Sequence, residues 1–230
     1  TINKHIYLMN RMLNLARHWC LVPAHNPDQQ PLKRLVVGDY KQRFLSADEI
    51  QRLLAACRRS SHPYLHHFVQ ILLLTGARKG EARTALWRDV DLDKRIWTVP
   101  RSKNGRSRRI VLNSNAVDTI NAIRRTAERL QQPTLPTSFV FTNPRTGRAY
   151  DSFYAAWYVA RDQAKLEDVR IHDLRHTFAS LLINKGVSLY EVQTLLGHSS
   201  VQMTQRYAHL APDRLHSRAE IVSGIVGKSI

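Results

Sequence analysis

The sequence predicts a mainly helical protein with one small antiparallel β-sheet, an α+β fold. Apolar residues recur at spacings of three and four along most of the chain, as they do on the buried face of a helix. The spacing changes to two at Arg95–Val99 and Arg108–Leu112, which indicates a pair of short strands. Ser46 and Ser188 each precede a glutamate by three residues, the capping-box pattern that begins a helix.

The remaining elements follow from the same patterns. Gly76, Gly186 and Gly197 stand where periodic segments stop, as glycines do at helix ends. Phe139–Phe141 is expected to be a short buried strand. Helices are expected at Ile2–Cys20, Ser46–Cys57, Tyr64–Leu74, Asn115–Leu130, Ser152–Ala164, Asp173–Asn184 and Ser188–Gly197, with a short one after Gly76 and another, capped by Ser199 or Ser200, that carries Tyr207.

The charge of the chain indicates a polyanionic partner. The 230 residues include 35 Lys and Arg against 18 Asp and Glu, a net charge of +17. This excess favours nucleic acid over an acidic membrane, since no purely amphipathic segment accompanies it. The longest apolar run, Phe68–Leu74 interrupted by Gln70, is too short to span a bilayer, and no signal peptide is visible. Cys20 and Cys57 fit buried thiols in a reducing compartment, so we expect a cytoplasmic protein without a membrane partner.

The first 44 residues are expected to lie outside the main domain. The opening helix has an apolar face too broad for a helix without partners, and a proline-containing, basic stretch follows it. We therefore expect residues 1–25 to be the last helix of an earlier domain, residues 26–44 to be a linker, and residues 45–230 to be the main domain. A basic linker is usually just solvated, but this one could also follow a phosphate backbone.

The predicted hairpin is a candidate for DNA contact. Asn104–Gly105 between the two strands is a strong signal for a tight turn, and Lys103 stands beside it. Charge gathered at the tip favours a finger that tracks DNA, although charge can also protect an exposed strand edge. The arginines expected to contact DNA are Arg101, Arg106, Arg108 and Arg109.

Two pairs of residues, each three positions apart, lie near the starts of predicted helices. His172 and Arg175 lie three positions apart, so an imidazole and a guanidinium fork can converge on one anion. Arg78 and Glu81 have the same spacing near another helix start, where an ordinary intrahelical ion pair is the simpler interpretation. A solvated basic helix face remains the alternative for His172 and Arg175.

A histidine and a tyrosine near the end of the chain complete the set of candidates. His198 follows Gly197 on a short connection, and Tyr207 comes nine positions later. His172, His176 and His198 have no cysteine or carboxylate at ligand spacing, so neither a metal site nor another cofactor is expected.

Four segments together resemble the tyrosine recombinases of the phage integrase family. They occur in the family's order: TGARKGE (75–81), SKNGRSRRIVL (102–112), HDLRHTFAS (172–180) and LLGHSSVQMTQRYAHL (195–210). The resemblance implies the catalytic-domain fold of that family from about Phe44 to Leu210. It also implies that residues 1–25 end a truncated core-binding domain, and that a helix at about 212–226 is exchanged with a neighbouring subunit.

The resemblance also implies a role for each of six catalytic residues. Tyr207 would attack the DNA and form a 3′-phosphotyrosyl link. Arg78 and Arg175 would clamp the scissile phosphate, and Lys103 would protonate the leaving 5′ oxygen. His172 would act as a general acid or base, and His198 would hydrogen-bond the phosphate. Glu81 would support the site structurally.

The function implied by the resemblance is site-specific recombination for DNA integration or excision, without metal, ATP or another cofactor. The expected partners are double-stranded DNA and further copies of the chain. These would form a homotetramer on two recombination sites but associate weakly or not at all without DNA, and accessory DNA-bending proteins are further candidates. Such an enzyme would be bacterial or phage-encoded and act at the nucleoid. The alternatives are a type IB topoisomerase, a non-catalytic DNA-binding module and a metal-dependent nuclease.

Overall fold

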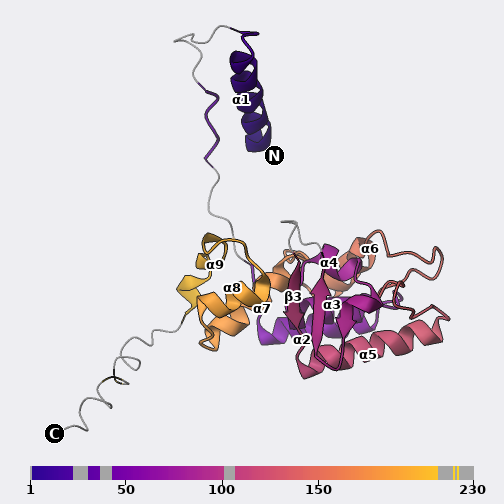
Figure 1. The fold of residues 1–230 in the computed structure, drawn as a ribbon. Helices are drawn as coiled ribbons and strands as arrows, with labels where there is room; N and C mark the ends of the chain where they lie inside the picture. Colours follow the sequence, from indigo (N-terminus) through magenta and orange to yellow (C-terminus); the bar gives the residue numbers. More distant parts are fainter. Residues whose placement is uncertain are drawn as a thin grey trace. The chain divides into compact units, whose positions relative to one another are not determined.

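A computed structural model describes residues 2–22, 31–36, 43–100 and 107–211, together with residues 220 and 222 (Figure 1). The chain divides into two compact units, Thr1–Lys41 and Gln42–Ile230, and each is described by itself. No helix among the described residues has both the length and the apolar character needed to cross a membrane.

The first unit is a helix with an extended segment bonded along it. Helix α1 (Ile2–His18) buries none of its residues. Its Asn10 side chain accepts from the backbone N–H of Leu32 and donates to the Leu32 carbonyl, both at 3.0 Å. Asn3 makes the same pair of bonds with Leu35. Two amide side chains one heptad apart therefore fix segment 31–36 on α1. Cys20, expected to be buried, is exposed.

The second unit contains the remaining elements. The sheet has the order β1-β2-β3 with both pairs antiparallel, and Val99 pairs with Arg108 at the end of the β2–β3 ladder. The predicted α+β fold is thus confirmed, with β1 as an additional strand. The elements are α2 (Ala47–Arg58), α3 (Leu65–Thr75), α4 (Lys79–Arg83), η1 (Trp87–Asp89), β1 (Val90–Asp91), β2 (Ile96–Val99), β3 (Arg108–Val111), α5 (Ser114–Arg129), α6 (Tyr154–Gln163), α7 (Asp173–Asn184), α8 (Leu189–Leu196), α9 (Gln202–Gln205) and η2 (Ala208–Leu210).

Local signals place most helix ends correctly. Ser46 and Ser188 both form the predicted capping boxes, with Glu49 and Glu191. Gly76 ends α3 and Gly197 ends α8, each with a positive φ that favours glycine. These two turns set the direction in which the chain leaves for Arg78 and for His198, two of the candidate site residues.

Some predictions are wrong, and others fall outside the described residues. Phe139–Phe141 is not a strand: only Phe139 forms a bridge, to Leu86, and the next two residues lie in turns. Neither Ser199 nor Ser200 caps α9, which begins after Val201 without a side-chain cap, and Tyr207 follows that helix instead of lying within it. The Asn104–Gly105 turn and almost all of the expected 212–226 helix lie outside the described residues.

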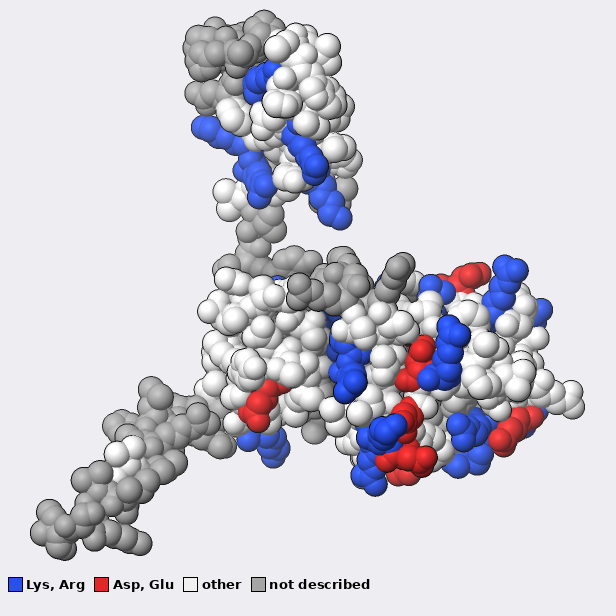
Figure 2. All heavy atoms as spheres, viewed as in Figure 1, with Lys and Arg blue, Asp and Glu red and all other residues white. Residues whose placement is uncertain are grey.

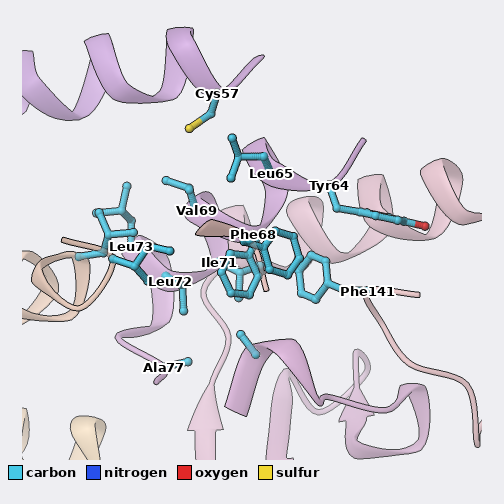
Figure 3. Close-up of a cluster of buried hydrophobic side chains, with 14 of the residues drawn as sticks. Cys57, Tyr64, Leu65, Phe68, Val69, Ile71, Leu72, Leu73, Ala77 and Phe141 are labelled. Atoms are coloured by element: carbon cyan, nitrogen blue, oxygen red, sulfur yellow. The ribbon is translucent and has the colours of Figure 1, made fainter. Parts of the chain in front are cut away.

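The main hydrophobic core is built around α3. This helix packs against α2, α5 and α7. Figure 3 shows its buried side chains, among them Phe68 and Leu72, with Phe141 beside Phe68. The Phe68 ring stacks on Phe153 at 3.9 Å between ring centroids. This core carries α4 and the start of α7.

A second, smaller cluster lies where α7, α8 and the α9 segment meet. Its buried residues among those described are Ala179, Ile183, Val192, Leu196 and Tyr207. Helix α7 contributes to both clusters, because Leu174 near its start belongs to the main core. The helix that carries His172, Arg175 and His176 at its N-terminal end is therefore fixed on both sides.

Candidate active site

Glu81 joins two arginines from different elements. Arg78 caps the N-terminus of α4, and its guanidinium donates to Glu81 at 2.9 Å while its backbone N–H donates to the same carboxylate. Arg108, on β3, donates to Glu81 through Nη2 at 2.6 Å and through Nε at 3.3 Å. The Glu81 side chain is only 7% exposed, and the paired arginines lower its pKa against the opposing effect of burial. Glu81 therefore stays ionised and fixes Arg78 in place.

Arg108 also reaches the turn that carries His198. Its Nη1 donates to the carbonyl of Leu195 at 3.2 Å. A Cβ on Gly197 would lie 2.6 Å from Arg108 Cδ, so the absence of a side chain there lets the arginine pass. The sequence analysis expected Arg108 to contact DNA. Its side chain is 9% exposed and donates hydrogen bonds inside the protein, to Glu81 and to the Leu195 carbonyl.

Arg175 is buried, and within the described part of the chain its guanidinium is bonded to backbone carbonyls and to no carboxylate. The residue is 4% exposed, and its guanidinium donates to the carbonyls of Gly76 at 2.5 Å and Leu196 at 2.8 Å. Burial and the positive charges of Arg78 and Arg108 lower its pKa to about 9, so it remains charged at neutral pH. A buried cation held by two neutral carbonyls attracts an anion strongly.

Two of the candidate histidines lie in the field of these arginines. His172 stands at the N-terminal end of α7, and desolvation followed by Arg175 lowers its pKa. His198 Nδ1 is 2.8 Å from the Thr204 hydroxyl, and desolvation, Arg175 and Arg78 lower its pKa to about 3. Both rings are therefore neutral at pH 7 and can donate or accept one hydrogen bond each.

The tyrosine expected to be the nucleophile is buried beside a histidine that the sequence analysis did not select. Tyr207 is 2% exposed, and its hydroxyl is hydrogen-bonded to Nδ1 of His176. Burial raises the pKa of Tyr207. His176 lies one helical turn after His172, and this spacing was the signal that could have identified it.

The described site carries an excess of positive charge. Among the described residues, Arg78 and Arg108 share the carboxylate of Glu81, and the guanidinium of Arg175 donates to two backbone carbonyls. The nearby carboxylate of Asp173 is engaged by Arg170. A hollow of about 590 Å³ opens beside the site and is lined in part by Arg78, Glu81 and His172. An anion that enters here meets preoriented donors and uncompensated charge.

Several predicted residues cannot be placed at the site. Lys103, Arg101 and Arg106 lie outside the described residues. Arg109, next to the buried Arg108, is exposed. Within the described part of the chain, no group of three His, Cys, Asp or Glu side chains could hold a metal ion.

The sequence matches the phage integrase family over residues 43–214. The chain belongs to this family. The match includes each of the residues just described. It begins close to the start of the second unit, so it adds nothing about the helix α1.

Curated relatives support the family membership over a wider range. The integrase of Salmonella phage P22 is 30% identical over 98% of this chain and 58% of that protein. The integrase of Haemophilus phage HP1 is 35% identical over 76% of this chain and 45% of that protein. The chain thus spans about half the length of the curated relatives it matches.

Solved structures agree with the fold. The catalytic domain of bacteriophage HP1 integrase has a TM-score of 0.61 and 30% identity, covering 78% of this chain and 95% of that one. The Tn1549 transposon integrase, solved in complex with a circular intermediate DNA, has a TM-score of 0.74 over 97% of this chain and 78% of that one. The identity in that case is 20%, so the likeness concerns the fold alone.

Proposed function

We propose that this chain carries the catalytic part of a site-specific DNA recombinase that cleaves and rejoins strands through a 3′-phosphotyrosyl intermediate. The observation that carries the proposal is the buried guanidinium of Arg175, which is held by two neutral backbone carbonyls in the same site as a buried tyrosine. Solved structures of relatives with DNA support double-stranded DNA as the partner.

The arginines supply what a metal ion supplies in other phosphoryl-transfer enzymes. Arg78 and Arg175 would bind the two non-bridging oxygens of the scissile phosphate and stabilise the charge that develops in the transition state. Glu81 and Arg108 keep Arg78 oriented for this task. His172 would transfer a proton, and His198 would hydrogen-bond the phosphate. Because the two arginines would take the place of a metal ion, the proposed reaction uses no metal.

Tyr207 would attack phosphorus while the 5′ oxygen leaves. A phenol has a pKa of ~10 and is mostly protonated at neutral pH, so it needs an acceptor for its proton during attack. The phosphotyrosyl bond keeps the energy of the cleaved diester, and a new 5′-hydroxyl can therefore reseal the strand. Lys103 would protonate the leaving oxygen.

The proposal is tested by trapping the covalent adduct on suicide DNA substrates, drawn from the flanks of the encoding gene, in EDTA and without ATP. Tyr207→Phe should abolish the adduct and keep DNA binding, because it removes one hydroxyl from a buried ring. Tyr190→Phe is the matched control, since Tyr190 is 77% exposed. An adduct that survives in Tyr207→Phe, or one that EDTA eliminates, would contradict the proposal.

Lys103 can be tested independently. Lys103→Ala should slow cleavage of ordinary DNA much more than cleavage of DNA with a 5′-bridging phosphorothiolate, whose sulfur leaves without protonation. Equal defects on both substrates would mean that Lys103 binds the backbone and does not act as the acid.

The proposed assembly is a homotetramer on two DNA sites, aided by accessory DNA-bending proteins, in the cytoplasm of a bacterial cell. The segment at about 212–226 would pass to a neighbouring subunit, a head-to-tail exchange that closes a ring. Truncation after Ala211 should preserve adduct formation and prevent exchange between two duplexes. Normal strand exchange by the truncated protein would contradict the assembly, and DNA relaxation without strand exchange would favour a topoisomerase.

A further inference from the structure

The contact between His176 and Tyr207 has no place in the roles proposed above. Both residues are buried, at 7% and 2% exposure, and the phenol is hydrogen-bonded to Nδ1 of the imidazole. We propose that His176 is a positioning residue, which holds the Tyr207 hydroxyl by accepting its hydrogen bond and acts on the reaction only through Tyr207. This inference rests on the proposed function, because it assumes that Tyr207 is the nucleophile.

The direction of the hydrogen bond follows from the charge state of the ring. Burial, followed by the neighbouring His172, lowers the pKa of His176 to about 4, so the imidazole is neutral at pH 7. A neutral imidazole has one donor and one acceptor nitrogen. The buried phenol is also neutral, because burial raises its pKa, and it carries one proton to donate. With the ring proton on Nε2, Nδ1 accepts from Tyr207.

The imidazole is fixed by the helix that also carries the phosphate ligands. His172, Arg175 and His176 all belong to the first turn of α7 or the residue before it. The His172 and His176 rings meet edge to face with centroids 5.0 Å apart. His172 borders the hollow beside Arg78, whereas His176 faces Tyr207.

One helix thus fixes two parts of the reaction relative to each other. Arg175 and His172 set the place of the phosphate, and His176 sets the place of the attacking oxygen. Misplacement of a reacting group by about 1 Å can slow an enzyme by roughly 100-fold. The hydrogen bond to His176 therefore matters for rate as well as for burial of the phenol.

A purely structural role is the competing explanation, because a buried tyrosine hydroxyl generally needs a partner. The two explanations differ in what a replacement of His176 changes. A structural role affects the free energy of unfolding and every activity of the site alike. A positioning role affects cleavage by Tyr207 and spares cleavage that does not use it.

The first experiment measures single-turnover adduct formation and DNA affinity. In His176→Asn the side-chain oxygen lies about where Nδ1 was and still accepts a hydrogen bond, whereas His176→Leu removes the acceptor. We expect the Leu variant to form adduct about 100-fold more slowly and the Asn variant to stay within about 10-fold of the unchanged protein. His209→Leu is the control, since His209 is exposed two residues after Tyr207. DNA affinity should be the same in all of them.

The second experiment replaces the nucleophile. In a Tyr207→Phe background, hydrogen peroxide supplies the attacking oxygen, and its rate of cleavage is compared with and without His176→Leu. The rates should agree within about twofold, because His176 has no tyrosine left to position. If peroxide supports no cleavage, the first experiment decides. If the Leu variant unfolds, the Asn variant decides: adduct formation slowed by more than about 10-fold at unchanged DNA affinity would overturn the inference.

Three results would overturn the inference: normal adduct formation by His176→Leu, an Asn variant as slow as the Leu variant, or an equal loss of peroxide-dependent cleavage. Failure of the proposed function looks different. In that case Tyr207→Phe itself continues to form the adduct, whatever stands at position 176.

Discussion

Arg175 and Tyr207 lie beside hydrophobic clusters of different size, and different contacts hold their side chains in place. Arg78 and Arg175 lie on elements packed against the large core around α3, and ion pairs with Glu81 fix one of them. Tyr207 belongs to the small cluster of α7, α8 and the α9 segment, where its hydroxyl is bonded to one histidine. The arginines proposed to clamp the phosphate are therefore held more rigidly than the proposed nucleophile. Such a division suits an enzyme in which binding DNA adjusts the tyrosine and leaves the clamp unchanged.

The largest effect is expected from Arg175. Arg175→Ala should slow adduct formation by hundreds-fold, equivalent to about 3–4 kcal/mol of barrier, because it removes a preoriented donor from the transition state. Arg175→Lys keeps the charge but loses the fork that also bonds to Gly76 and Leu196, so it should remain strongly impaired. Single-turnover cleavage on suicide DNA measures both variants. Full activity of the lysine variant would show that charge alone suffices.

A matched pair of core substitutions tests the difference between the two clusters. Ile123 in the large core and Ile183 in the small cluster are both fully buried. Replacement of a buried isoleucine by alanine costs about 2–5 kcal/mol, and the cost is larger where the surroundings relax less. Ile123→Ala should fall near the upper end and Ile183→Ala near the lower end, as measured by urea denaturation.

The two variants should also differ in the rate of adduct formation. Ile183→Ala should slow adduct formation at unchanged DNA affinity, because it loosens the packing around Tyr207, whereas Ile123→Ala should preserve both as long as it is folded. If Ile123→Ala and Ile183→Ala lost the same free energy of unfolding and kept the same activity, the proposed difference in rigidity between the two clusters would be contradicted.

The smallest expected effect is the contribution of His67, on helix α3, to the pH dependence of the free energy of unfolding. Burial lowers the pKa of His67 to about 4, with His66, Arg125 and Arg129 adding to the effect. The folded-state pKa lies below the unfolded value of about 6.5, so the folded state binds fewer protons between these values. The free energy of unfolding should be highest above pH 6.5 and fall toward pH 4, by on the order of 1 kcal/mol for this residue after solvent screening.

His67→Gln tests that assignment, since the amide does not titrate. Its unfolding free energy, measured by urea denaturation at several pH values, should decline less steeply between pH 6.5 and 4 than that of the unchanged protein. Identical slopes would mean that other histidines whose pKa is lowered, His176 and His198 among them, account for the pH dependence.

The parts of the structure that were predictable are those set by neighbours in sequence. The capping boxes at Ser46 and Ser188 and the glycine turns at Gly76 and Gly197 follow from local backbone requirements, and they appear as expected. The prediction of a strand at Phe139–Phe141 failed because apolar residues in a buried turn have the same composition as a short strand.

The contacts that define the site could not be predicted in this way. Arg108 meets Glu81 across 27 positions, and His176 meets Tyr207 across 31. From the hairpin pattern, the side chain of Arg108 was expected to point outward to DNA. In the structure it points inward and bonds to Glu81 on α4 and to the Leu195 carbonyl on α8. His176 belongs to a sequence motif that could be recognised. Its contact with Tyr207 depends on how the segment after α9 packs against α7, which the sequence pattern does not show.

The central claim is that Tyr207 attacks DNA from a site in which Arg78 and Arg175 hold the phosphate. The most direct measurement is to digest the adduct trapped on suicide DNA with protease and nuclease and to locate the nucleotide-bearing residue by mass spectrometry. The account predicts the mass of a 3′-linked nucleotide on the peptide that contains Tyr207. The same mass on a peptide containing Tyr158 or Tyr190, or a link through the 5′ end of the DNA, would contradict it.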